Sequence, residues 1–325
     1  MLPKRYVYLQ STLFAILGIG LLYVSFRKTN FSELLGVIQN GNHWVLAPVF
    51  FVSVWVIIAR SLRWQVLFNG IGFKAPFNVL LASLASGYLV NFAVPRLGEI
   101  SRAMLLKKSL QYPINTSLGT IVFERIADVI CLGIIICTAF LLEFLNHGSL
   151  LNNFTKDINL ITPNKILVLG LLLGVGIVIY KWLKKRHDGF SEWITKLIDT
   201  ALSLVKIKQK SWFLVHTISI WIGFYLMTYL WFFMFQDSAK LTMYDAFLVM
   251  VLGVVARTLP IQAGSAGAYH FVVSQAFVLL GLNLVNSNAL AIVIHGFQTI
   301  LTLLFGFTAY LWLFYYNKKN ATKIN

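Results

Sequence analysis

Residues 77–102 read FNVLLASLASGYLVNFAVPRLGEISR, an apolar segment that stops at a proline and then becomes charged. Pro95 ends a helix, because its ring and its missing N–H disrupt the helical hydrogen bonds. Gly98 permits a tight turn into a second helix at about 98–112. The pattern predicts a helical hairpin at 77–112, whose first helix covers 77–95.

A second apolar segment is broken in the same way near the end of the chain. Residues 243–260 stop at Pro260 and continue as IQAGSAG over 261–267, before a helical stretch at 265–281. Small residues of this kind let backbones approach closely. The pattern predicts a second hairpin at 243–281.

The composition places both hairpins in a membrane. Of the 325 residues, 58% are hydrophobic and 12% are charged, whereas a soluble domain carries about 25% charged residues. We expect an all-α integral membrane protein, a single transmembrane domain over 1–325 with two re-entrant hairpins and no room for a soluble catalytic domain. Apolar segments of bilayer length, about 20 residues, predict six transmembrane helices at 7–26, 44–66, 117–142, 163–183, 211–235 and 288–316.

The basic residues predict the topology. Lys4 and Arg5 precede the first span, which lacks a signal-peptide cleavage site, and positive charge favours the cytoplasmic side. If the broken segments are hairpins rather than full spans, both termini and the basic linker 184–210 also lie in the cytoplasm. The linker is predicted to be an interfacial amphipathic helix. We therefore assign the net charge of +16 to topology and anionic lipid, not to nucleic acid, and expect the inner (plasma) membrane of a bacterium or archaeon.

This topology divides the chain into two inverted halves. Residues 1–142 and 163–316 each contain helix, helix, hairpin and helix, with three crossings. An odd number of crossings inverts the second half, so the two hairpins would enter from opposite faces and meet near the midplane. Inverted repeats with discontinuous helices at their centre are a transporter architecture.

The turn of the first hairpin is the strongest candidate site. A new helix beginning near Gly98 would point its amides and its positive dipole end into the membrane, where Arg96 and Arg102 add cations. Buried charge at this depth is costly and usually functional, and an anionic lipid phosphate is the natural partner. The alternative is a self-satisfied ion-pair network that only fixes the hairpin. The candidate headgroup-binding residues are Asn91, Pro95, Arg96, Gly98, Glu99 and Arg102.

Two further clusters of polar residues are candidate sites. Glu124, Arg125 and Asp128 share helix 117–142 and form either an ion-pair lock with Arg96 or Arg102, or a counter-charge or proton-coupling set. In the second hairpin, polar residues are expected near His295 and Gln298 of the last helix. A membrane histidine is also an ordinary hydrogen-bonded packing residue. The second-hairpin candidates are Arg257, Pro260, Gln262, Gly264, Ser265, Tyr269 and His270.

Catalytic and cofactor motifs are missing from the sequence. It contains no G-x-S-x-G, P-loop, dinucleotide fingerprint or H-E-x-x-H. The histidines lack metal-ligand spacing, and Cys131 and Cys137 are interpreted as packing residues. We expect no cofactor, no metal, no enzymatic activity and no ATP-driven step.

The motifs resemble those of a flippase-like membrane family that includes the transmembrane region of lysylphosphatidylglycerol synthases. The run from Asn91 to Arg102 resembles its P-x-R-x-G-E-x-x-R element, and Glu124 to Asp128 is similar to its E-R-x-x-D element. Leu259 to Gly264 resembles its second proline–glycine element, and Arg60 to Trp64 its R-x-x-R-W. The similarity covers about residues 5–316. One departure is Tyr269-His270, where many relatives have a glutamate.

The resemblance implies lipid translocation. In bifunctional members the membrane part moves an aminoacylated phospholipid to the outer leaflet, and a separate cytosolic domain makes that lipid. The sequence ends at Asn325, just after the last helix, so we expect no synthase domain. The hypothesis is a transporter of an anionic or aminoacylated phospholipid, in which Arg96, Arg102 and the amides near Gly98 hold the phosphate. Glu99, Glu124 and Asp128 would balance those charges.

Two other functions stay open. The protein could present lipid substrates to a separate synthase or glycosyltransferase through its basic linker, without transporting them. It could also be an intramembrane enzyme acting on polyprenyl-phosphate lipids, which would require Glu99 and His270 to converge.

Overall fold

The computed structural model describes residues 18–27, 29–94, 97–145, 199, 206–258 and 262–321, which are helical apart from short connections. Residues 18–26 form a helix, and three short 3-10 helices lie at His43–Val45, Phe232–Met234 and Ser238–Lys240. The other α-helices are α2 (Phe31–Gln39), α3 (Leu46–Gly70), α4 (Phe77–Ala93), α5 (Leu97–Leu110), α6 (Ile114–Leu145), α10 (Lys210–Trp231), α11 (Met243–Thr258), α12 (Gln262–Leu279) and α13 (Leu284–Ala321).

Four described segments are long and apolar enough to cross a membrane. They are His43–Gly70, Ile114–Glu143, Lys210–Met234 and Leu284–Asn320. They confirm the spans expected at 44–66, 117–142, 211–235 and 288–316. The expected span at 7–26 is described only from residue 18, and the span at 163–183 lies outside the described residues, so the count of six stays a prediction. Most of the linker 184–210 also lies outside them, since only residues 199 and 206–210 of it are described.

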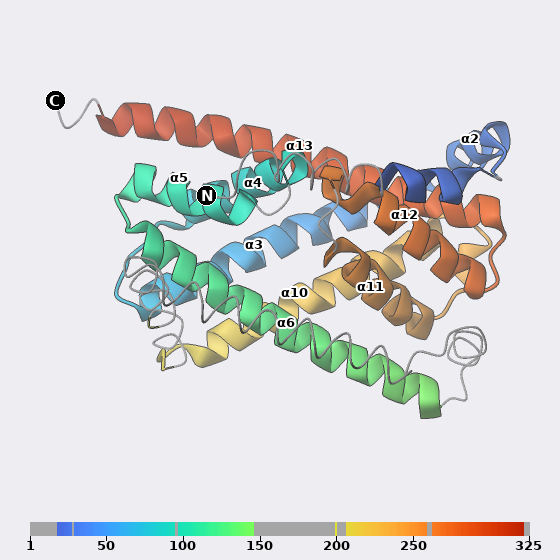
Figure 1. Cartoon of the computed structure of the whole chain (residues 1–325), viewed down its shortest axis with the longest axis horizontal. Helices are drawn as coiled ribbons and strands as arrows, with labels where there is room; N and C mark the ends of the chain where they lie inside the picture. The colour runs from blue at the N-terminus through green and yellow to red at the C-terminus, as the bar shows by residue number, and fades with distance from the viewer. Residues whose placement is uncertain are drawn as a thin grey trace, which may run out of the picture. The chain divides into compact units, whose positions relative to one another are not determined.

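The chain forms two compact units, one of Met1–Ile114 and Ile207–Asn325, the other of Asn115–Lys206, which contains α6. In the first unit α3 packs along α10, α4 against α5, and α11 against α12. The long helix α13 contacts both α4 and α12. Figure 1 shows α13 in red, α12 in orange and α4 in teal. Helix α13 therefore joins the two pairs of short helices.

The two broken segments do form pairs of short helices. With 17 residues in α4, 14 in α5 and 16 in α11, each is shorter than the roughly 20 residues that a full crossing needs. Helix α4 ends at Ala93 and α5 begins at Leu97, close to the predicted break at Pro95. Helix α11 ends at Thr258, close to Pro260. The proline signals thus located both breaks to within about two residues.

Glycines hold α4 between two neighbours. A Cβ atom on Gly98 of α5 would lie 2.2 Å from the carbonyl oxygen of Gly87, and one on Gly306 of α13 would lie 2.6 Å from Cβ of Leu89. Only glycine allows backbones to approach this closely. The position of α4 is therefore fixed by α5 on one side and α13 on another.

A buried polar network attaches the first described helix to the same unit. Asn288 of α13 is fully buried and donates to the carbonyl of Ser25 at 3.0 Å and to Thr29 Oγ1 at 2.6 Å. Its side-chain oxygen accepts a hydrogen bond from Ser274 of α12. Buried polar groups need such partners, so helix 18–26 is fixed against α12 and α13.

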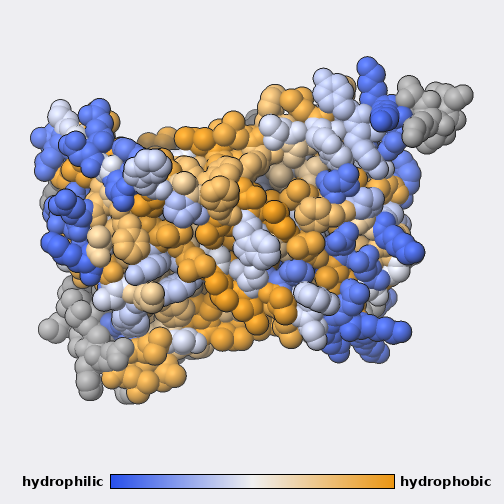
Figure 2. Space-filling view, turned by 180° about the vertical axis from the view of Figure 1, so that it is seen from behind, coloured by the Kyte–Doolittle hydropathy of each residue, from blue (hydrophilic) through white to orange (hydrophobic). Residues whose placement is uncertain are grey.

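The surface is apolar over much of the visible face. Figure 2 shows hydrophobic side chains across its middle and hydrophilic ones toward both ends. Large apolar side chains stand exposed on the spans, for example Phe51 at 69% and Val129 at 67%. Apolar surface of this extent faces lipid rather than water.

Candidate functional site

A polar cavity of about 190 Å³ lies where α4, α11 and α13 meet. Helices α4 and α11 begin the two broken segments, and their lining residues come from the last turns before the chain breaks. The cavity therefore lies where the ends of both broken helices come together. It is lined by Tyr88, Asn91 and Phe92 of α4, Arg257 of α11, and His295, Gln298, Thr299 and Thr302 of α13.

Arg257 is held in this cavity from two sides. Its guanidinium donates to Oε1 of Gln298, and its Cζ lies 4.3 Å from the ring centre of Tyr269. A cation over an aromatic face is attracted by the ring quadrupole. Tyr269 of α12 and Gln298 of α13 thus both contact Arg257, whose side chain is exposed at the cavity.

Histidines stand beside the arginine. The His295 ring centre lies 5.5 Å from that of Tyr269 and 4.9 Å from that of His270. Nδ1 of His270 bonds to the carbonyl of Ala266, which can only accept, so this nitrogen carries the proton. His270 is 8% exposed, whereas His295 is half-buried and lines the cavity. The expected convergence of Tyr269 and His270 with His295 is present.

The α4 wall is also hydrogen-bonded. The Tyr88 hydroxyl accepts from Nη1 of Arg60 at 2.8 Å, which leaves its own proton to donate. Asn91 accepts from the backbone N–H of Gly98 at 2.6 Å and donates to Oε2 of Glu99 at 3.5 Å. Asn91 thereby joins the cavity to the start of α5.

The other described members of the first predicted cluster, Gly98, Glu99 and Arg102, are not among the lining residues of this cavity. Pro95 and Arg96 fall outside the described residues. Gly98 is packed against Gly87, and its amide is occupied by Asn91. Arg102 is 4% exposed, with its Cζ 4.4 Å from the ring centre of Trp64. Of this cluster's described members, the structure brings only Asn91 into the cavity wall.

The cluster on α6 belongs to the other unit. Arg125 Nη2 pairs with Asp128 Oδ2 at 3.1 Å, one helical turn apart, and Glu124 is 1% exposed. Their role as an ion-pair lock or a proton-coupling set stays a prediction. In the second hairpin, Pro260 lies outside the described residues, and Gln262, Gly264 and Ser265 fall in the first turn of α12, where only the backbone is described.

Four lining residues were missed by sequence reasoning, namely Tyr88, Phe92, Thr299 and Thr302. A signal for the threonines was present. His295, Gln298, Thr299 and Thr302 stand at positions i, i+3, i+4 and i+7, which lie on one face of a helix. Tyr88 likewise lies three residues before Asn91. No comparable signal marks Phe92, which is one of many apolar residues in α4.

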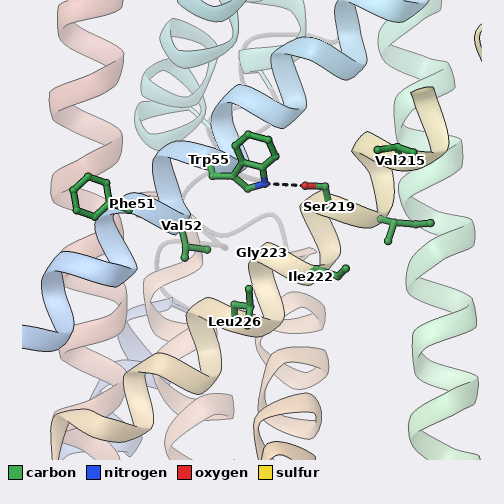
Figure 3. Close-up of a pocket in the computed structure, with 9 residues that line it drawn as sticks. Phe51, Val52, Trp55, Val215, Ser219, Ile222, Gly223 and Leu226 are labelled. Atoms are coloured by element: carbon green, nitrogen blue, oxygen red, sulfur yellow. Dashed lines mark hydrogen bonds between the residues drawn. The ribbon is translucent and has the colours of Figure 1, made fainter. Parts of the chain in front are cut away.

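A second pocket has the opposite character. Figure 3 shows a groove of about 530 Å³ between α3 and α10, with Phe51, Val52, Ile222 and Leu226 in its wall. One polar link crosses it, from Trp55 Nε1 to Ser219 Oγ at 2.8 Å. An almost wholly apolar lining on two spanning helices suits hydrocarbon.

No group of three or more His, Cys, Asp or Glu residues in the described part of the chain is placed to hold a metal ion. Cys131 and Cys137 both lie on α6 and are not joined by a disulfide.

Comparison with known proteins identifies the family. The model of the lysylphosphatidylglycerol synthase TM region matches residues 11–306. Searches of curated proteins and of solved structures gave no match. The matched range contains every residue that lines the cavity, and together with the spanning helices it indicates a multi-pass membrane protein with a lipid-related role. The chain belongs to the family of the lysylphosphatidylglycerol synthase TM region.

Proposed function

We propose that this protein moves an anionic or aminoacylated phospholipid between the leaflets of the membrane, with the headgroup passing through the α4–α11–α13 cavity. One observation carries the proposal: Arg257 lines a polar cavity where the ends of both broken helices meet. An ionised side chain at membrane depth is a functional-site hypothesis by default.

The lining groups favour an anion. Arg257 supplies a positive charge, and no Asp or Glu stands among the described residues of the lining. Gln298 accepts from Arg257 through its oxygen, so its amide N–H groups remain to donate. The Tyr88 hydroxyl can also donate, because Arg60 occupies its lone pair. These three donors suit phosphate oxygens.

The size of the cavity fits a headgroup rather than a whole lipid. Its 190 Å³ is below the roughly 300–1,000 Å³ of typical small-molecule pockets. The acyl chains would stay in the surrounding bilayer. A cationic aminoacyl group would meet Glu99, a carboxylate that Asn91 links to the cavity wall.

The proposal treats α4–α5 and α11–α12 as re-entrant hairpins in inverted halves, with both termini cytoplasmic. Each hairpin would close the cavity from one face in turn. The short helix lengths and the shared cavity support this arrangement. Movement would follow a concentration gradient or the membrane potential, and no covalent step is assigned to the chain.

A liposome assay tests the proposal. Purified protein is reconstituted with fluorescent phosphatidylglycerol, and the label left accessible outside reports the movement of lipid between leaflets. We expect translocation well above that of protein-free liposomes. Arg257→Gln should lower it at least about tenfold, which corresponds to about 1.4 kcal/mol of lost stabilisation. Arg27→Gln, at an exposed arginine outside the cavity, is the matched control.

Two outcomes count against the proposal. Wild-type protein that moves lipid no faster than empty liposomes would exclude transport and leave the lipid-presenting role, which co-purification of a synthase or glycosyltransferase would support. Unchanged transport in Arg257→Gln would exclude the cavity as the headgroup path.

A further inference from the structure

The groove between α3 and α10 has the length of one lipid chain. Its volume of about 530 Å³ lies within the roughly 300–1,000 Å³ of pockets that bind small molecules. On α10 the lining runs from Val215 to Leu226, eleven positions that rise about 16 Å along the helix axis. Half of the hydrocarbon core of a bilayer is about 15 Å thick. The groove therefore covers the depth that an acyl chain occupies in one leaflet.

The walls of the groove offer contacts to hydrocarbon. Trp55 and Ser219 are the polar side chains of the described lining, and Figure 3 shows them bonded to each other across the groove. Beside Gly223 the two helices are in close contact, since a Cβ atom there would lie 2.4 Å from Cγ2 of Val56. Both helices are long and apolar enough to span the membrane. A ligand of this groove is therefore an apolar chain.

Positive charge lies beyond one end of the groove. Lys210 begins α10 five positions before Val215, about 7.5 Å along the axis, and each headgroup layer is about 5–7 Å thick. Lys208 and Lys210 are both exposed. Trp212 is also exposed, and tryptophan is typical of the membrane interface. Residues 206–236 and α3 contain no Asp or Glu. This end therefore favours an anionic headgroup at the level of the interface.

We propose that the groove binds an anionic phospholipid of the surrounding bilayer, with one acyl chain between α3 and α10 and the headgroup at Lys208 and Lys210. As described, the groove shares no lining residue with the α4–α11–α13 cavity. This lipid is therefore a bound partner of the protein and not the lipid in transit. Because its chain contacts both helices, it binds the folded protein and stabilises it by mass action.

Photolabelling tests which molecule lies in the groove. Protein in liposomes is illuminated with phosphatidylglycerol or phosphatidylcholine that carries a diazirine near the end of one acyl chain, and labelled residues are identified by mass spectrometry. We expect the groove lining to be labelled at least about fivefold more by the phosphatidylglycerol probe, the effect of one lysine near an anionic headgroup. Phe307, exposed on α13 outside both pockets, should be labelled equally by both probes.

A pair of double variants tests the headgroup end. Lys208→Gln with Lys210→Gln should abolish the preference for phosphatidylglycerol, while the groove is still labelled through its apolar walls. Lys107→Gln with Lys108→Gln removes the same charge from exposed positions on α5 and should keep the preference. A preference that survives in the first double variant would contradict the headgroup assignment.

A pair of single variants tests the chain end. Ile218→Trp places a larger side chain in the groove wall and should lower labelling of the rest of the lining several-fold. Phe307→Trp is the matched control, since Phe307 is 57% exposed and Ile218 58%, and it should leave labelling of the groove unchanged.

Two results with wild-type protein would overturn the inference. Equal labelling of the groove by both probes would show bulk lipid there. Absence of label from the groove, with Phe307 labelled, would show that another part of the chain or a second copy covers it. Neither result depends on lipid movement, so both are independent of the transport function.

Thermal unfolding of delipidated protein in detergent gives a second measure. Added phosphatidylglycerol should raise the Tm of wild type and of Phe307→Trp at least about 2 °C more than that of Ile218→Trp. The comparison between variants removes any contribution from lipid bound in the α4–α11–α13 cavity, which both variants keep. An equal rise in Ile218→Trp and Phe307→Trp would overturn the inference.

Discussion

At the scale of single residues, the side-chain amide of Asn91 makes two hydrogen bonds to the start of α5. Its oxygen accepts the backbone N–H of Gly98, and its nitrogen donates to Glu99. The same side chain lines the cavity. Asn91 therefore contributes both to the stability of the first hairpin and to the wall that a headgroup would touch.

Replacing Asn91 by alanine should destabilise the protein. The substitution removes the acceptor of the Gly98 N–H, and a buried donor left without a partner costs about 1–3 kcal/mol. Chemical or thermal unfolding in detergent measures the change. Asn69→Ala, at an exposed position at the end of α3, should stay within about 0.5 kcal/mol. An equal loss in both variants would contradict the role given to the Asn91–Gly98 bond.

At the scale of helices, α4 is held by close backbone contacts. Gly98 of α5 meets the Gly87 carbonyl, and Gly306 of α13 meets the backbone of Ala85 and the side chain of Leu89. In a bilayer, helix association depends on packing of this kind, because lipid tails are as apolar as leucine. Of the two, the contact at Gly98 should be the less tolerant, since an added Cβ would lie 2.2 Å from a backbone oxygen there and 2.6 Å from its nearest atom at Gly306.

The substitution Gly98→Ala tests this contact. Its Cβ would lie 2.2 Å from a backbone oxygen, so α4 and α5 must separate, at a cost of about 1–3 kcal/mol. Unfolding in detergent should show the loss, and lipid translocation should fall with it. Gly296→Ala on α13 is the matched control, because nothing lies within 4 Å of the added atom. It should be neutral or stabilise by as much as about 1 kcal/mol. A Gly98→Ala protein as stable as the control would refute the close packing.

At the scale of the whole chain, helix ends far apart in sequence share one cavity. Asn91 and Arg257 come from the ends of α4 and α11, and α13 completes the wall. Two inverted halves would bring their broken helices together in this way. Cysteine labelling can test whether the chain has this topology.

Cysteine labelling distinguishes re-entrant hairpins from full crossings. In a background with Cys131 and Cys137 replaced by serine, Val94→Cys places a thiol at the break between α4 and α5, and Lys108→Cys places one at the end of α5. Re-entry predicts that a membrane-impermeant maleimide labels position 108 from one side and position 94 from neither. Labelling of position 94 from the opposite face would establish two full crossings. Denatured protein, labelled at both sites, shows that the thiols are reactive.

Much of this fold follows from local sequence signals. Long apolar segments predicted the four described spans, and the prolines predicted the positions of both helix breaks. Arg257, His295 and Gln298 were recognisable because polar residues are rare in spanning helices. Thr302 was not, since threonine can bond back to its own helix, as it does here to the carbonyl of Gln298. The packing of Arg102 on Trp64 depends on how α3 and α5 approach each other, which no local pattern encodes.

The contacts among Gly87, Asn91 and Gly98 carry a consequence for how this protein can evolve. A side chain at 87 or 98 would push α4 and α5 apart, and a wider separation would take the Gly98 amide out of reach of Asn91. Once one of these residues is replaced, the close contact and the hydrogen bond that require the other two are lost. Related sequences should keep all three residues or replace them together, and the replacements should bring a different hairpin angle and a different cavity wall.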